Sequence, residues 1–178
     1  MPQATLSPTL RNSLTMGTLS PESLIVSINA SVTTLVASQA WPLANMAIYV
    51  PIEILYPVTV TRLLVNNGTT VAGNIDVGIF DVNGSRMVSM GSVIQSGTSA
   101  SQLFDIPDTT LLPGMYYMGL ALSNVTGTIS GFGGVFVDMA PMGFGQQASA
   151  FPLPATISPT TFSGTFAPII TMAIQPTI

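Results

Sequence analysis

Residues 73–90 read GNIDVGIFDVNGSRMVSM, and this stretch decides the fold of the chain. Apolar Ile75, Val77 and Ile79 alternate with polar or small residues, which is the period of a strand with one buried face. Asn83-Gly84 is a preferred dipeptide for a two-residue type I′ turn, because both positions of that turn need a positive φ. The stretch therefore predicts a β-hairpin with its turn at residues 83 and 84.

A two-residue turn at this place fixes the register of the hairpin. Asp81 is then expected opposite Arg86, which is a favourable cross-strand pair. Ile79 is expected opposite Val88, so that both side chains share the buried face, an arrangement that a slip of one residue would break.

Working outward, residues 112–122 read LPGMYYMGLAL and predict a turn followed by another strand. Pro113-Gly114 supplies the turn. The alternation places two sets of side chains on opposite faces: Tyr116, Met118, Leu120 and Leu122 on one, and Tyr117, Gly119 and Ala121 on the other.

Further β-prone segments occur along the chain, separated by Gly, Asn and Pro turns. Strands are expected at residues 32–36, 47–54, 58–65 and 103–106, within 125–137, and as a strand pair or edge strand at 162–174. Pro51 cannot donate a ladder hydrogen bond and indicates an edge strand. Asp105 and Asp108 bracket Ile106-Pro107 and are expected to form a turn. Short strands at this spacing predict an all-β, single β-sandwich or jelly-roll-like domain, with helix far below the usual third or so of residues.

Three regions differ in composition. Residues 1–25 are rich in Ser, Thr and Pro and are expected to form an extended N-terminal arm, residues 26–145 the sandwich core, and residues 146–178 a Pro-rich extended segment with an edge strand. Residues 139–178 are uncharged and are incompatible with a helix because they contain Pro141, Pro152, Pro154, Pro159, Pro168 and Pro176.

The chain is unusually poor in charge. Only 6% of its 178 residues are charged and 47% are hydrophobic, whereas about a quarter of residues are charged in an ordinary soluble domain. Mean hydropathy is +0.59. A lone soluble domain needs a charged, mixed surface, so much of this surface is expected to lie against other protein chains. The alternative is a monomer whose surface is covered by Ser, Thr, Asn and Gln.

The charge balance and residue usage exclude several classes. A net charge of −4 and a pI near 4.1 argue against nucleic-acid binding. No basic-then-apolar signal peptide follows Met1. Residues 23–52 carry no formal charge but are interrupted by polar residues and Pro42, so no membrane span is expected.

The chain also lacks the side chains of most catalytic sites. It has no His, Cys or Lys, so only carboxylates remain as general acids or bases. These are Glu22, Glu53, Asp76, Asp81, Asp105, Asp108 and Asp138. No pair of them is placed to flank a sugar bond. We therefore expect no enzyme activity, no catalytic residues and no cofactor.

Two groups of residues have the chemistry of a binding site, and each also has a structural explanation. Asp76, Asp81 and Asn83 carry oxygen ligands suited to Ca²⁺, but a hairpin turn accounts for them, so no metal site is expected. Asn-x-Ser/Thr at Asn29, Asn67, Asn83 and Asn124 fits turn chemistry. Sugars stack on aromatic side chains, and the candidates are Trp41, Tyr49, Tyr56, Tyr116 and Tyr117, which serve equally well as core or rim residues.

Four segments together resemble a family of short, mostly uncharacterised virion proteins of tailed bacteriophages. They are GNIDVGIFD at 73–81, SGTSA at 96–100, LPGMYYM at 112–118 and QQASAFPLPAT at 146–156. The resemblance covers residues 41–166, and its last segment is the most specific. Pieces similar to the Asn-Ile-Asp of the first segment and the Pro-Gly-x-Tyr-Tyr of the third also occur in secreted prepeptidase-type sandwich domains. The resemblance implies a structural protein of the phage particle and carries over no functional residues.

The expected function is therefore non-enzymatic: a capsid decoration, cement or head-fibre protein on the virion exterior, held by its extended termini and self-associated as a homotrimer. One alternative is a tail-fibre or baseplate component whose exposed loop at residues 95–101 touches host glycans. A second is a secreted polysaccharide-binding sandwich module. The expected partners are copies of the chain and other capsid or tail proteins.

Overall fold

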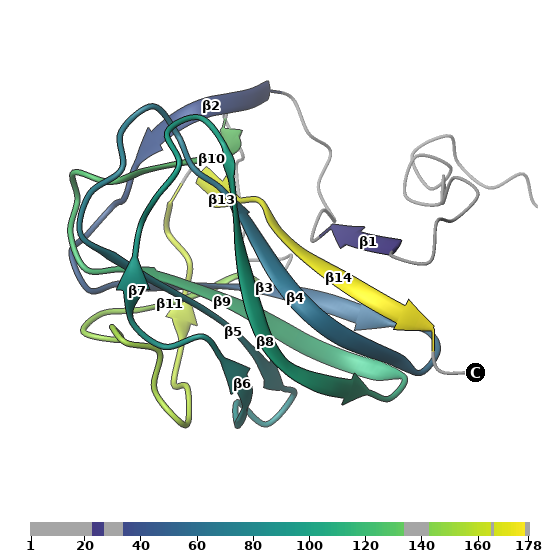
Figure 1. Ribbon diagram of the computed structural model, residues 1–178. Helices are drawn as coiled ribbons and strands as arrows, with labels where there is room; N and C mark the ends of the chain where they lie inside the picture. Colours follow the sequence, from purple (N-terminus) through teal and green to yellow (C-terminus); the bar gives the residue numbers. More distant parts are fainter. Residues whose placement is uncertain (1–22, 27–33, 134–142, 165, 177–178) are drawn as a thin grey trace, which may run out of the picture.

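The computed structural model describes residues 23–26, 34–133, 143–164 and 166–176, and over these ranges the chain is all-β (Figure 1). Several antiparallel sheets pack together as a sandwich, which confirms the fold class expected from the alternation of apolar residues.

The first sheet has the order β1-β14-β4-β8. Its strands are β1 (Ser23–Val26), β14 (Ile170–Pro176), β4 (Val58–Asn66) and β8 (Ser101–Leu111). The large sheet has the order β12-β11-β3-β9-β5-β6, with β7 paired to β5. Its strands are β12 (Thr160–Thr161), β11 (Gly145–Gln147), β3 (Ala47–Ile54), β9 (Gly114–Leu122), β5 (Asn74–Asp81), β6 (Arg86–Ser89) and β7 (Val93–Ile94). A small sheet combines β13 (Phe166–Pro168), β10 (Thr128–Gly133) and β2 (Thr34–Ala40).

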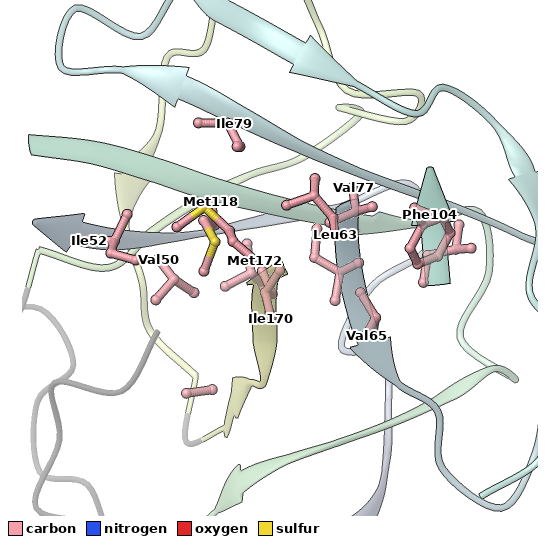
Figure 2. Close-up of a cluster of buried hydrophobic side chains, with 14 of the residues drawn as sticks. Val50, Ile52, Leu63, Val65, Val77, Ile79, Phe104, Met118, Ile170 and Met172 are labelled. Atoms are coloured by element: carbon pink, nitrogen blue, oxygen red, sulfur yellow. The ribbon is translucent and has the colours of Figure 1, made fainter. Parts of the chain in front are cut away.

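The main core lies between the first sheet and the large sheet. Figure 2 shows Met118 of β9 beside Met172 of β14, and Val77 of β5 near Leu63 of β4. All four side chains are fully buried. Each strand contributes alternate residues to this core, as the period-two pattern requires.

Strand β9 separates its side chains as the sequence predicted. Met118, Leu120 and Leu122 are buried in the main core, with Tyr116 packed against it. Ala121 and Tyr117 belong to a second apolar cluster on the outer face of the large sheet. The large sheet is thus apolar on both faces near β9, and its outer face needs a cover.

The predicted hairpin is present, but its turn differs from the expected one. Ile79 does pair with Val88, whereas a bulge places Phe80, not Asp81, opposite Arg86. Gly84 has φ 82° and Asn83 is not among the residues with positive φ. Gly84 N donates to Asp81 O, and Asp81 Oδ1 accepts from Asn83 N and Ser85 N. The connection is therefore a longer loop with Gly84 in the left-handed region, stabilised by the Asp81 carboxylate.

Three strand expectations were wrong in extent or position. Strand β8 has 11 residues rather than four, because Pro107 lies in a bulge of β8 itself, where residues 106–108 face a single residue of β4 between the pairs Asp105–Arg62 and Thr109–Val60. Asp105 and Asp108 consequently lie in this strand and not in a turn. Strand β14 is interior, between β1 and β4, rather than an edge strand.

Strand β3 is likewise paired on both sides, but unequally. It pairs with β9 along its whole length and with β11 only over Ala47–Tyr49. Pro51 lies just beyond the β11 pairing, where β3 has no neighbour among the described strands. The proline signal therefore marked a local free edge and not an edge strand.

Candidate functional site

Residues 145–157, which we call the strap, begin with strand β11 of the large sheet and then cover the outer face of that sheet. Ala150, Leu153 and Ile157 of the strap pack on Tyr49 and Phe80 of the sheet and form one buried cluster with them. The Tyr49 and Phe80 rings meet edge to face at 5.5 Å. The strap contains the QQASAFPLPAT segment, so the most specific part of the sequence resemblance has a structural role in this fold.

A buried carboxylate holds the strap against the sheet. Asp76 is fully buried, and its Oδ2 accepts a hydrogen bond from Leu153 N at 2.8 Å. Its Oδ1 accepts from Ser89 Oγ at 2.8 Å and from Gly91 N at 2.9 Å. Asp76 therefore connects the β6–β7 connection, the hairpin and the strap.

Arg86 supports the same junction from the other side of Leu153. Its Nη1 donates to Leu153 O at 2.6 Å, and its backbone N donates to Ala155 O at 2.9 Å. At the far end of the hairpin, Gly84 O accepts from Ile157 N. Arg86 is thus engaged with the strap and not with Asp81, as the two-residue turn would have required.

The electrostatics of Asp76 are governed by its burial. Desolvation raises the pKa of its carboxyl group, while hydrogen bonds from Ser89, Leu153 and Gly91 and the charge of Arg86 act in the opposite direction. Burial also raises the pKa of Tyr49, and the nearby Asp76 adds to that shift. A perturbed carboxyl can mark a catalytic acid. This one is closed off from solvent and its hydrogen bonds all go to the fold, so its geometry is that of an anchor.

A second buried polar group lies where β4, β7 and β10 approach one another. Gln95 Nε2 donates to Asn67 Oδ1 and to Thr128 O, each at 3.0 Å, and Gln95 Oε1 accepts from Ala72 N. Asn67 Nδ2 donates to Ser96 O and to Gln102 Oε1. Only 3% of Gln95 is exposed, so the expected exposed loop is confined to residues 96–100, and Gln95 is a structural residue.

The aromatic candidates for sugar stacking are mostly inside the fold. Trp41 is 1% exposed and its Nε1 donates to Met46 O, while Tyr49 lies beneath the strap. Tyr116 is half-buried and donates its hydroxyl hydrogen to Leu112 O. Tyr56, at 42%, is the most exposed of these rings. The aromatics do not form a stacking platform among the described residues.

The carboxylates do not gather either. Asp76 is buried beneath the strap, Asp81 stabilises its turn, and Asp105 lies 3.6 Å from Arg62 on the surface of the first sheet. Within the described ranges no three acidic, His or Cys side chains are placed to hold a metal ion. Glu22, Asn29 and Asp138 lie outside the described residues.

The structure reveals an exposed apolar surface that the sequence patterns did not single out. Two connections cross between the sheets at one end of the sandwich: residues 55–57 join β3 to β4, and residues 112–113 join β8 to β9. They lie side by side because Ile54 pairs with Gly114 and Val58 with Leu111. We call the exposed residues here the apolar end: Leu55 at 68%, Tyr56 at 42%, Leu112 at 63% and Met115 at 46%.

The structural role of Asp76 could have been predicted from the sequence. Asp76 is the one charged residue of the stretch 75–80, whose other residues are apolar or glycine, and a charge there must find partners if both faces are covered. The apolar end could not be predicted in the same way. Its two connections, at residues 55–57 and 112–113, are far apart in the sequence and form one surface only because the strands that flank them pair.

Comparison of the chain with protein-family models, with curated proteins and with solved structures gives no match. Across the described part of the chain, no helix has the length and apolar character needed to cross a membrane.

Proposed function

We propose that this protein is a non-enzymatic structural component of a tailed-phage virion exterior, a capsid decoration, cement or head-fibre protein that associates with copies of itself as a homotrimer. Its extended termini hold it to neighbouring virion proteins. The mechanism is burial of apolar surface between chains, with no chemical step.

One observation carries the proposal: a chain with 6% charged residues leaves large apolar side chains exposed at its surface. A domain living alone in water avoids contiguous apolar patches and offsets single apolar residues with charge. Subunits of a large particle bury such surface against their neighbours. The resemblance to virion proteins at the strap supports the same assignment.

A tail position on the same particle is the second candidate. The loop at residues 96–100 is exposed at every position and carries hydroxyl groups at Ser96, Thr98 and Ser99, which suit contacts with host glycans. The secreted polysaccharide-binding module is weaker, because burial of Trp41 and Tyr49 removes two of its five stacking candidates.

Quantitative mass spectrometry of purified virions tests the proposal and separates the two positions. A decoration protein is expected in fixed proportion to the capsid protein, and a tail component at a small fixed number per particle. Absence of the chain from washed particles contradicts both. Glycan binding by the isolated monomeric protein, together with that absence, indicates the secreted module.

The role of the N-terminal arm is tested by deleting residues 1–20. We expect the truncated protein to keep the sandwich, measured by an unchanged emission of buried Trp41, and to lose incorporation into particles. Incorporation of the truncated protein at the normal level shows that the arm is not the anchor.

A further inference from the structure

We infer that the apolar end, formed by Leu55, Tyr56, Leu112 and Met115, is the contact surface between copies of this chain. The inference rests on the self-association in the proposed function and locates it on the fold. It does not depend on which position the protein takes on a particle.

The apolar end is an exposed apolar surface on two short connections that contain proline. Each of its four residues is at least 42% exposed, and exposed apolar side chains gathered at one place often mark a functional surface. The neighbouring Pro57 and Pro113 are also exposed. Proline and short connections keep this surface in one shape, so little conformational entropy is lost when it is covered.

The apolar end lies beside the start of β1 and the end of β14. Ser23 of β1 pairs with Ile174 of β14, and Pro176 of β14 pairs with Val58, the first residue of β4. The chain therefore enters β1 and leaves β14 at the end where residues 55–57 and 112–113 cross. Figure 1 shows the arrowheads of β8 and β14 together at this end.

The lack of charge around the apolar end indicates which partner covers it. Glu53, paired with Met115, is the charged residue nearest the apolar end along its strands, and the described arginines lie elsewhere, in β4 and at the start of β6. A partner with ordinary charge density would bury unpaired charges against this surface, at a cost of several kcal/mol each. A second copy brings a surface as poor in charge as the first, so it fits without that cost.

A stable interface between two copies needs more buried area than the apolar end alone provides. A stable contact buries about 800 Å² on each partner, which is more than four partly exposed side chains supply. The rest falls to residues around it, with Glu53 at the rim, where charge is tolerated.

Sedimentation of the full chain over a wide concentration range tests the inference. We expect wild-type protein to associate with rising concentration. The double variant Leu55→Lys/Leu112→Lys, which places two charges in the contact, is expected to associate at least tenfold more weakly. Both positions are more than half exposed, so the variant should fold, which Trp41 emission checks.

A matched control uses apolar residues with similar exposure outside the apolar end. Val82 is 61% and Ile94 is 74% exposed, so Val82→Lys/Ile94→Lys adds the same charge and is expected to associate like wild type. If wild-type protein stays monomeric, self-association and the inference both fail. If wild type associates and the Leu55/Leu112 variant does so equally, only the location of the contact is wrong. The presence of the chain in virions is tested separately by mass spectrometry.

A second measurement uses the absence of cysteine in the chain. Leu112→Cys introduces one thiol, whose reaction with a maleimide is expected to slow as protein concentration rises and copies cover it. Ile94→Cys is expected to react at one rate at all concentrations. Equal behaviour of the two thiols overturns the inference.

Discussion

The Asp76 carboxylate and the Leu153 backbone amide, 77 residues apart in the chain, are joined by a 2.8 Å hydrogen bond beneath a fully covered surface. This bond ties the central hairpin to the strap that covers it. Because the strap and the outer sheet face bury each other's apolar side chains, the bond fixes the register of a contact whose free energy comes mainly from apolar burial.

Replacing Asp76 with Asn should loosen the strap. The amide oxygen of Asn can still accept from Ser89 and Gly91, but its NH₂ group then faces Leu153 N, so one donor is left without an acceptor. We expect a loss of about 1–3 kcal/mol in the free energy of unfolding, measured by urea denaturation. Amide exchange at Leu153 should accelerate more than exchange in β4. Asp105→Asn is the control: its side chain is 84% exposed, and its pair with Arg62 should contribute no more than about 1 kcal/mol.

The difference in stability between wild type and Asp76→Asn is expected to change with pH in one direction. Because burial raises the pKa of Asp76 above its ordinary 3.8, the folded protein binds more protons than the unfolded chain between 3.8 and the raised value. The contribution of Asp76 to stability therefore falls as pH rises through that window. The advantage of wild type over Asp76→Asn should be largest at the acidic end and shrink with rising pH, while the other carboxylates cancel in the difference. An advantage that grows with pH would show that Ser89, Gly91, Leu153 and Arg86 outweigh desolvation.

Much of the fold follows from local patterns in the sequence. The two faces of β9 and the pairing of Ile79 with Val88 are set by period-two alternation, which a sheet with a buried face enforces over its whole length. The hairpin turn was missed because Asn83-Gly84 satisfies both a two-residue turn and a longer loop with a single left-handed glycine. The carboxylate of Asp81, which accepts from Asn83 N and Ser85 N, favours the second.

The strap and the apolar end could not be predicted in this way. The strap has too many prolines for a regular pattern, and its position depends on contacts with Asp76 and Arg86 far away in the chain. Pro107 similarly concealed the length of β8, since a proline is tolerated there only because β8 bulges at residues 106–108. Non-local pairing, and not residue preference, decides these features.

Gln95 offers a test of the buried polar group. Gln95→Glu keeps the shape and the acceptor for Ala72 N, but it replaces the donor to Asn67 Oδ1 and Thr128 O with a second acceptor. We expect a loss of about 2–4 kcal/mol at neutral pH. The loss should become smaller in acid, where a protonated Glu regains one donor. The exposed loop provides the control, because Ser99→Ala removes a hydroxyl group outside this network and should change stability by less than about 0.5 kcal/mol. A Gln95→Glu variant as stable as wild type at neutral pH would show that the network does not contribute.

Gly119 lies under the two rings that the strap covers, and it gives the last prediction. It pairs with Tyr49 on one side and Gly78 on the other. A Cβ atom at Gly119 would lie 2.9 Å from the Phe80 ring and 3.0 Å from the Tyr49 ring, closer than packed carbon atoms allow. Its φ is outside the left-handed region, so Gly119→Ala tests packing and not backbone strain. We expect a loss of about 1–3 kcal/mol in the free energy of unfolding from overpacking, although an alanine by itself would restrict the unfolded chain and stabilise the protein.

The double variant Gly119→Ala/Phe80→Leu restores room for the added methyl group, so its loss should be smaller than the sum of the two single losses. Strict additivity of the two losses would show that the ring of Phe80 is not what excludes a side chain at position 119.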